Sequence, residues 1–344
     1  MAACGNWRLA TGSAACLALA WLCIAPAHSA DDPATAAEQL TERYALVKIT
    51  GRVWGLPAEQ QLRARLKRLP ELRERIVTAQ KELDERIAQN NAAWKGAELA
   101  IAAINQRLAQ LTTTDPQRGL LLQERAKWTA SAIPPADLAS RNIVRGTLAQ
   151  LGQDRATLAI DLAWIRSTAG AMSERYRELA DNDDLSRLIQ EAGEKCRLGP
   201  ARNYQVEVRK LEEYDKLAFA PHAPLYLQSG RVRVTAVVND AACVTFSWSD
   251  ASDAVTFLPE SIAHSTGIEV PADARRETLK IDGRTIEARE VFLSSLLLGS
   301  CHGKSVAAFV LPPEAEDLGA QLTPLALSPH RVKVERERLR LVVQ

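Results

Sequence analysis

The sequence lacks an excess of charge of either sign, because 43 basic residues stand against 42 acidic residues in a chain of 344. Such a balance creates no broad field that would hold nucleic acid or an anionic membrane surface. We therefore expect no nucleic acid among the partners of this protein.

The chain also lacks the spacings that carry metal or hydrolytic chemistry. It has no C-x-x-C, no G-x-S-x-G and no H-E-x-x-H, and its five histidines are scattered. The segment Gly299 to Ser305 imitates a phosphate-binding loop, but one residue is missing between its glycines and an apolar, strand-like run follows. We expect a β-turn there, no metal and no cofactor.

No apolar run reaches the ~20 residues that a membrane span needs. A run of about a dozen residues, Ala14 to Ala25, follows Arg8 and precedes Ala27-His28-Ser29, a small-x-small cleavage site. This pattern predicts a signal peptide over residues 1–29, a periplasmic or secreted protein, and no stable membrane insertion after cleavage. Two alternatives are an uncleaved anchor and a lipid anchor on Cys23, although the bulky Trp21-Leu22 does not suit a lipobox.

Cleavage would leave three cysteines, Cys196, Cys243 and Cys301. An odd number in an oxidising compartment allows at most one internal disulfide and leaves a free thiol. The pairing stays open.

Residues 58–195 predict a helical hairpin, and residues 30–57 a linker or short lead-in. Apolar residues recur in alternating steps of three and four, which is typical of a coiled coil. One edge of the first seam comprises Leu66, Ile87, Trp94, Ile101 and Leu108, and the other Leu62, Leu69, Ile76, Leu83, Ala97, Ile104 and Leu111. Three polar residues, Arg73, Gln80 and Asn90, interrupt the seam and can fix its register or partner.

Proline-bearing breaks at residues 112–116 and 133–135 end this first seam. A second seam follows, made of Val144, Leu148, Leu151, Leu158, Leu162, Ile165, Met172, Tyr176 and Leu179. We expect two long antiparallel helices, with a further helix near residues 117–131. Pro70 is expected to kink the first helix or to mark where its regular part begins. The hairpin serves as a scaffold or as a partner-binding or dimerising surface.

Residues 196–344 have a β-rich pattern. Residues 231–238 alternate with period two, and residues 244–248 form a second short run. Asp282-Gly283 is a strong turn signal at the centre of a hairpin over residues 277–287. Residues 291–298 and 306–311 predict another strand pair, and residues 331–343 a last alternating segment.

This half resembles the retropepsin-like aspartic proteases, in which a strand delivers Asp-Thr/Ser-Gly-Ala-Ser before β-branched residues and a short helix. Here residues 250–257 occupy that stretch and lead through Leu258-Pro259 into residues 260–268. An alignment without gaps places Asp250 on the catalytic aspartate. The resemblance implies an acid-protease β-barrel with residues 282–284 in the flap, and with Gln321-Leu322-Thr323 in the segment that supports the catalytic loop. The fold class is thus α plus all-β, in two parts.

The motif departs from the family where the chemistry depends on it. In that family two aspartates from two domains share a proton and activate water, a threonine hydroxyl locks the loops, and glycine allows the tight turn. This chain has Ala251 for the threonine, Ser252 for the glycine, an added Asp253, and Thr323 for the second glycine. These changes predict a pseudoprotease.

Two other interpretations of this loop remain. A register with a two-residue insertion places Trp248 at the aspartate and Asp250 at the glycine. Asp250 also fits a plain turn, where aspartate and serine side chains bond to the backbone.

The sequence thus favours an exported coiled-coil protein whose degenerate protease domain binds peptides or proteins or acts in assembly. One alternative is an active homodimeric aspartic endopeptidase that uses Asp250. The other is a structural envelope protein that relies on the coiled coil.

Overall fold

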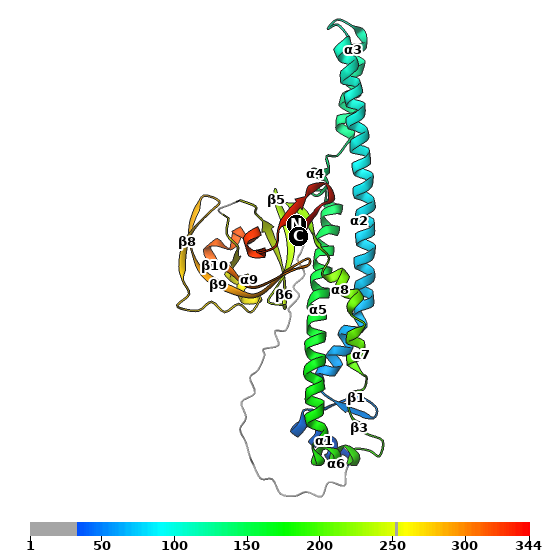
Figure 1. Ribbon diagram of the computed structural model, residues 1–344, viewed down its shortest axis with the longest axis vertical. Coiled ribbons are helices and arrows are strands. Elements are labelled where there is room, and N and C mark those ends of the chain that lie inside the picture. The colour runs from blue at the N-terminus through cyan, green and yellow to red at the C-terminus, as the bar shows by residue number, and fades with distance from the viewer. Residues whose placement is uncertain (1–32, 252–253) are drawn as a thin grey trace.

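The computed structural model describes residues 33–251 and 254–344. The predicted signal peptide, Ser252 and Asp253 lie outside these ranges. Figure 1 shows a long helical part with a β-rich part against its side. Among the described residues, none of the helices combines the length and the apolar character needed to cross a membrane.

The helical part is built on α2 (Pro57–Gln110) and α5 (Asn142–Ala180), which run side by side in opposite directions (Figure 1). The short connection holds α3 (Pro116–Ser131), where a helix was predicted, and α4 (Pro135–Leu138). The Asp115 carboxylate caps α3 by accepting a hydrogen bond from the Gln117 N–H, at 2.8 Å. Helix α2 continues through Pro70 and so begins well before it.

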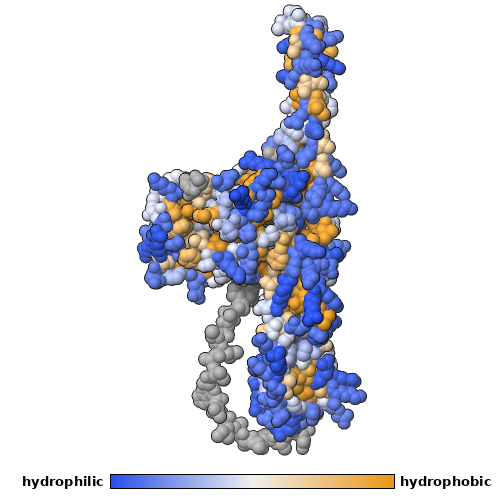
Figure 2. All heavy atoms as spheres, viewed as in Figure 1, coloured by the Kyte–Doolittle hydropathy of each residue, from blue (hydrophilic) through white to orange (hydrophobic). Residues whose placement is uncertain are grey.

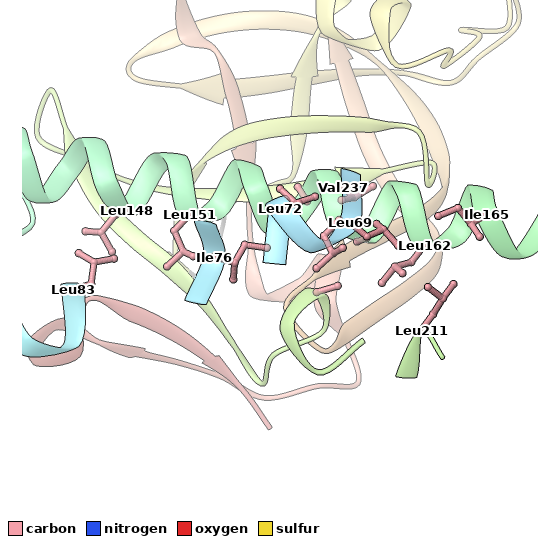
Figure 3. Close-up of a cluster of buried hydrophobic side chains, with 14 of the residues drawn as sticks. Leu69, Leu72, Ile76, Leu83, Leu148, Leu151, Leu162, Ile165, Leu211 and Val237 are labelled. Atoms are coloured by element: carbon pink, nitrogen blue, oxygen red, sulfur yellow. The ribbon is translucent and has the colours of Figure 1, made fainter. Parts of the chain in front are cut away.

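Most of the predicted seam residues are buried between α2 and α5. Figure 3 shows Leu69, Ile76 and Leu83 of α2 among Leu148, Leu151 and Leu162 of α5. In the view of Figure 2, hydrophilic residues cover most of the outer surface of the two helices. This burial is what an apolar stripe on each helix produces. A supercoil stays a prediction.

The segment expected as a lead-in contains regular structure. It forms α1 (Pro33–Tyr44), β1 (Val47–Thr50) and β2 (Val53–Gly55). Helix α1 packs against α6 (Asp183–Glu191), and β2 pairs in parallel with β3 (Arg197–Leu198). A small apolar cluster that includes Leu40, Leu46 and Leu185 holds this end of the helical part together.

The β-rich part follows two short helices, α7 (Tyr204–Arg209) and α8 (Glu212–Ala218). Its strands are β4 (His222–Gln228), β5 (Arg231–Val238), β6 (Ala242–Trp248), β7 (Phe257–Pro259), β8 (Arg276–Ile281), β9 (Arg284–Leu298), β10 (Cys301–Leu311), β11 (Ala320–Leu322), β12 (Val332–Glu335) and β13 (Arg340–Val343). Short helical turns α9 (Glu260–Ser265), η1 (Pro313–Leu318), η2 (Pro324–Leu327) and η3 (Arg336–Arg338) lie between them.

The strands form one mixed sheet in the order β12-β13-β4-β5-β6-β11-β7-β10-β9-β8. Strand β5 also pairs with β9, so the pairings from β5 through β6, β11, β7, β10 and β9 return to β5. The predicted hairpin is present as β8 and β9, and its turn residues Asp282 and Gly283 have φ values of 51° and 78°. Both values are positive, as a two-residue type I′ turn requires.

The helical and β-rich parts share one apolar core. The cluster between α2 and α5 also contains Tyr226 of β4, Val237 of β5 and Leu339 (Figure 3 labels Val237). Helix α5 lies close to β5 at Gly152, where an added Cβ would lie 3.0 Å from the Thr235 Oγ1. The β-rich part is therefore fixed to the side of α5.

Candidate functional site

The loop that carries Asp250 joins β6 to β7 across the end of β11. Strand β11 lies between these two strands, parallel to β6 and antiparallel to β7. The Ser249 N–H donates to the Leu322 carbonyl at 3.0 Å, which continues the pairing of β6 with β11 beyond the last strand residue. Asp250 therefore follows directly on a fixed strand end.

The segment predicted to support this loop does contact it. The hydroxyls of Thr256 and Thr323, both buried, lie 3.1 Å apart, and the Thr323 N–H donates to the Thr256 Oγ1 at 3.3 Å. The Gln321 side-chain amide donates to the Val255 carbonyl at 3.0 Å. Thr323, which stands where the resemblance implies a glycine, uses its side chain to tie β11 to the returning end of the loop.

Asp250 and Ala251 are exposed. Within residues 33–251 and 254–344, the Asp250 carboxylate makes no hydrogen bond or ion pair. One chain supplies one such carboxylate at this loop end, whereas shared-proton chemistry requires two in close contact. The methyl group of Ala251 offers no hydroxyl with which to lock a second loop.

The hairpin of β8 and β9, which the resemblance places in the flap, is fastened to its own sheet. Asp282 at its tip pairs with Arg231, and Arg284 donates to the Asp317 carboxylate at 2.8 and 2.9 Å. Behind the tip, Ile281 and Ile286 are buried in a cluster with Phe257 and Leu318. The apolar face of the hairpin is therefore covered by the rest of the β-rich part.

The segment that imitates a phosphate loop comprises the turn at Gly299 and Ser300 and the first residues of β10. Cys301 is buried, and burial raises the pKa of its thiol. His302 points the other way, 3.8 Å from the Asp240 carboxylate.

All three described cysteines, Cys196, Cys243 and Cys301, carry free thiols. In the described ranges, no group of three or more His, Cys, Asp or Glu side chains could hold a metal ion.

The structure also reveals a polar site that the sequence did not indicate. Arg155 of α5 is buried against β4, where it donates to the His222 carbonyl at 3.1 Å and to the Gln80 side chain of α2 at 2.9 Å. Burial lowers the pKa of Arg155 to about 10, so the guanidinium stays charged at neutral pH. Beside it lies a cavity of about 290 Å³ that Gln80 and His222 help to line.

One signal could have located this site. The steps of three and four along the second seam require a core residue between Leu151 and Leu158, and Arg155 occupies that position. A charged residue on an apolar seam needs a specific buried partner. The partners themselves, on α2 and β4, carry no sequence pattern that points to Arg155.

A second buried polar cluster is structural. Glu59, at the start of α2, is fully buried and accepts hydrogen bonds from Tyr176 at 2.6 Å, Tyr204 at 2.9 Å and the Ala201 N–H at 2.8 Å. Burial and the hydrogen bond to Glu59 raise the pKa of both tyrosines. The cluster holds α2, α5 and α7 together near the end of the helical part that lies opposite α3.

Comparisons with known proteins identify no family for this chain. No protein-family model matches it, and no curated protein matches it. Among solved structures, it is similar to a retropepsin-like aspartic protease from Rickettsia conorii, with a TM-score of 0.28 and 15% sequence identity. The match covers 36% of this chain and 87% of the other. A TM-score this low supports no inference about activity.

Proposed function

We propose that this chain is an exported protein, periplasmic or secreted, whose β-rich part is a degenerate retropepsin-like barrel that binds peptides or proteins without cleaving them. The helical part presents this barrel as an antiparallel coiled-coil hairpin. The proposal rests on the motif residues together with the arrangement of the strands around the Asp250 loop.

Three structural observations support the retropepsin-like assignment. The strand pairings form a closed circuit, as a barrel requires. Strand β7 ends with Leu258-Pro259 and α9 begins at the next residue, in the order that the motif implies. The segment Gln321 to Thr323 contacts the loop before and after Asp250.

The observation that carries the loss of proteolysis is the chemistry next to Asp250. Ala251 is exposed and has no hydroxyl with which to lock two loops together. Directly after β11, the side chain of Thr323 fills the position of the supporting glycine and bonds to Thr256. The uncharged contact between Thr256 and Thr323 thus stands in place of the supporting glycine, and the hydroxyl that would help to bring two carboxylates together is missing.

Binding does not require the aspartate. An extended peptide adds to a sheet through backbone hydrogen bonds, and side-chain pockets supply the specificity. Strand β8 is one end of the strand order, so one of its edges is not paired to another strand in the described sheet. A peptide or a partner protein could pair there without any catalytic group.

Cleavage assays separate this proposal from the protease alternative. The mature protein, which should begin at Ala30 by N-terminal sequencing, is incubated with a mixed peptide library from about pH 3 to pH 7, where a carboxylate pair would work. We expect some peptides to co-elute with the protein on gel filtration, and none to be cut.

Asp250→Ala is the test variant, and Asp273→Ala, at another exposed aspartate, is its control. Cleavage that Asp250→Ala abolishes and Asp273→Ala keeps would establish the endopeptidase. A dimer mass on gel filtration should accompany it, because one chain supplies a single carboxylate. If no peptide is either retained or cut, the structural role of the helical hairpin is favoured instead.

A further inference from the structure

A cavity of about 290 Å³ lies where α2 and α5 meet β4 and the turn before β13. Its apolar wall comprises Leu83 and Ile87 of α2, Leu148 and Leu151 of α5, and Leu339. Polar and charged groups line the rest, namely Gln80, Asp84, Asn91, His222, Arg338 and Arg340. The cavity is therefore amphipathic, and it is separate from the Asp250 loop.

The buried guanidinium of Arg155 places a positive charge behind this cavity. Arg155 is 8% exposed and forms no ion pair among the described residues, although the charge of Asp84 acts on it from a longer distance. Its hydrogen bonds go to neutral oxygens of Gln80 and His222, and its Nε–H is buried without a partner. A buried charge is costly unless an opposite charge compensates it.

The rim of the cavity adds to this positive charge. Arg338 is exposed and, among the described residues, forms no hydrogen bond or ion pair, whereas Arg340 pairs with Glu335 at 2.7 Å. Asp84 is the single carboxylate that lines the cavity, and it accepts a hydrogen bond from Gln80 at 3.0 Å. Three guanidinium groups, those of Arg155, Arg338 and Arg340, thus stand against the two carboxylates of Asp84 and Glu335, which leaves one positive charge in excess.

His222 responds to this field. Burial, followed by the charges of Arg155 and Arg340, lowers the pKa of His222 to about 4, although Asp84 and Glu335 act in the opposite direction. The imidazole is therefore neutral at pH 7, and no further cation is added. The local potential suits one small anion.

We propose that this cavity binds a small monocarboxylate that carries a short aliphatic group. The carboxylate lies at the rim with Arg338 and Arg340, because guanidinium groups match carboxylates in charge and shape. The aliphatic group lies against the leucine and isoleucine wall. The volume equals that of roughly ten water molecules at ~30 Å³ each, which fits a ligand of about that many non-hydrogen atoms.

The test uses the full mature protein and two probes of equal shape, N-acetyl-L-leucine and N-acetyl-L-leucinamide, with binding measured by calorimetry or NMR titration. Only the first carries a carboxylate. We expect it to bind at least about tenfold more tightly than the amide, which corresponds to ~1.4 kcal/mol. Inorganic phosphate, which has charge but no aliphatic group, should compete weakly.

Arg338→Gln is the test variant, because its side chain is exposed and can be replaced without disturbing the core. Arg336→Gln, on the same turn but outside the cavity, is the control. We expect Arg338→Gln to weaken N-acetyl-L-leucine about tenfold and Arg336→Gln to leave it unchanged. The proposal is overturned if N-acetyl-L-leucine does not bind up to about 10 mM, or if the acid and the amide bind with equal affinity. It is also overturned if both variants lose affinity equally, or if phosphate competes as strongly as the acid. Asp250→Ala should bind normally, so this result is independent of the proposed function.

Discussion

Polar residues on the helical seams fix how α2 and α5 pair. Glu59 contacts Tyr176 and Gln80 contacts Arg155, and the two contacts are separated by 21 residues on each helix. Twenty-one residues are three heptads, so both contacts belong to one antiparallel register. A slip by one turn would leave a buried carboxylate and a buried guanidinium without their partners. The polar breaks in the seam therefore specify a single alignment.

His222 should make stability depend on pH. Its pKa is about 4 in the folded protein, against an ordinary value of 6.5, so the unfolded chain binds more protons between these values. The contribution is fully present above pH 6.5 and is lost as the pH falls towards 4. We expect His222→Asn to reduce the acid loss of stability by about 1–2 kcal/mol.

Urea unfolding of the wild-type protein and His222→Asn at several pH values between about 7 and 4.5 measures this difference. Other carboxylates titrate equally in both proteins, so only the gap between the two curves matters. Two parallel curves would show that burial and the charges of Arg155 and Arg340 do not lower the pKa of His222.

At the scale of elements, two carboxylates of α5 hold α2 from one side. Asp161 is fully buried and accepts hydrogen bonds from Arg65 and Arg68, each at 2.7 Å. Asp154, one heptad earlier, accepts from Arg75 at 3.1 and 3.3 Å. Removing the charge of Asp161 should therefore lower the free energy of unfolding more than removing the charge of Asp154, because Asp161 is more deeply buried and its hydrogen bonds are shorter.

We expect Asp161→Asn to lower the free energy of unfolding by about 2–3 kcal/mol, and Asp154→Asn by about 1 kcal/mol. The two variants control for each other, since the helix, the substitution and the partner type are the same. Chemical denaturation gives both values. An equal or reversed order would mean that burial of the carboxylate does not set the strength of these pairs.

The elements that local pattern defines could be predicted from the sequence. The three-and-four spacing located α2 and α5, and Asp282-Gly283 located the β8–β9 turn. Strand β4 could not be predicted, because Pro224 lacks an N–H and argues against a strand. The half that contains Pro224 pairs with β13 from the end of the chain, whereas the second half pairs with the neighbouring β5.

The same contrast holds for the two sites. Asp250 could be singled out because its motif is continuous in the sequence, and its supporting segment because the resemblance placed it. The cavity beside Arg155 could not be foreseen, since its lining comes from α2, α5, β4, η3 and β13, which meet only in the folded chain. The break in the apolar periodicity at residue 155 marks only a residue behind this cavity.

At the scale of the whole molecule, the β-rich part depends on the close approach of α5 to β5. Gly152 is buried, and a Cβ there would lie 3.0 Å from the Oγ1 and 3.1 Å from the Cβ of Thr235. The second contact cannot be relieved by rotating the threonine, because its Cβ is fixed by the backbone of β5. A methyl group at residue 152 must therefore push α5 away from the sheet.

Gly152→Ala and Gly170→Ala isolate this effect, because both lie in α5 and a Cβ at Gly170 would meet nothing within 4 Å. Replacing a helical glycine by alanine should by itself stabilise the protein by about 0.5–1 kcal/mol, and we expect that gain in Gly170→Ala. Gly152→Ala should instead unfold at least ~1 kcal/mol more easily than Gly170→Ala, because the methyl group crowds Thr235. Thermal unfolding followed by far-ultraviolet circular dichroism measures the difference. If both variants gained stability alike, the helical and β-rich parts would not be joined through the contact of Gly152 with Thr235.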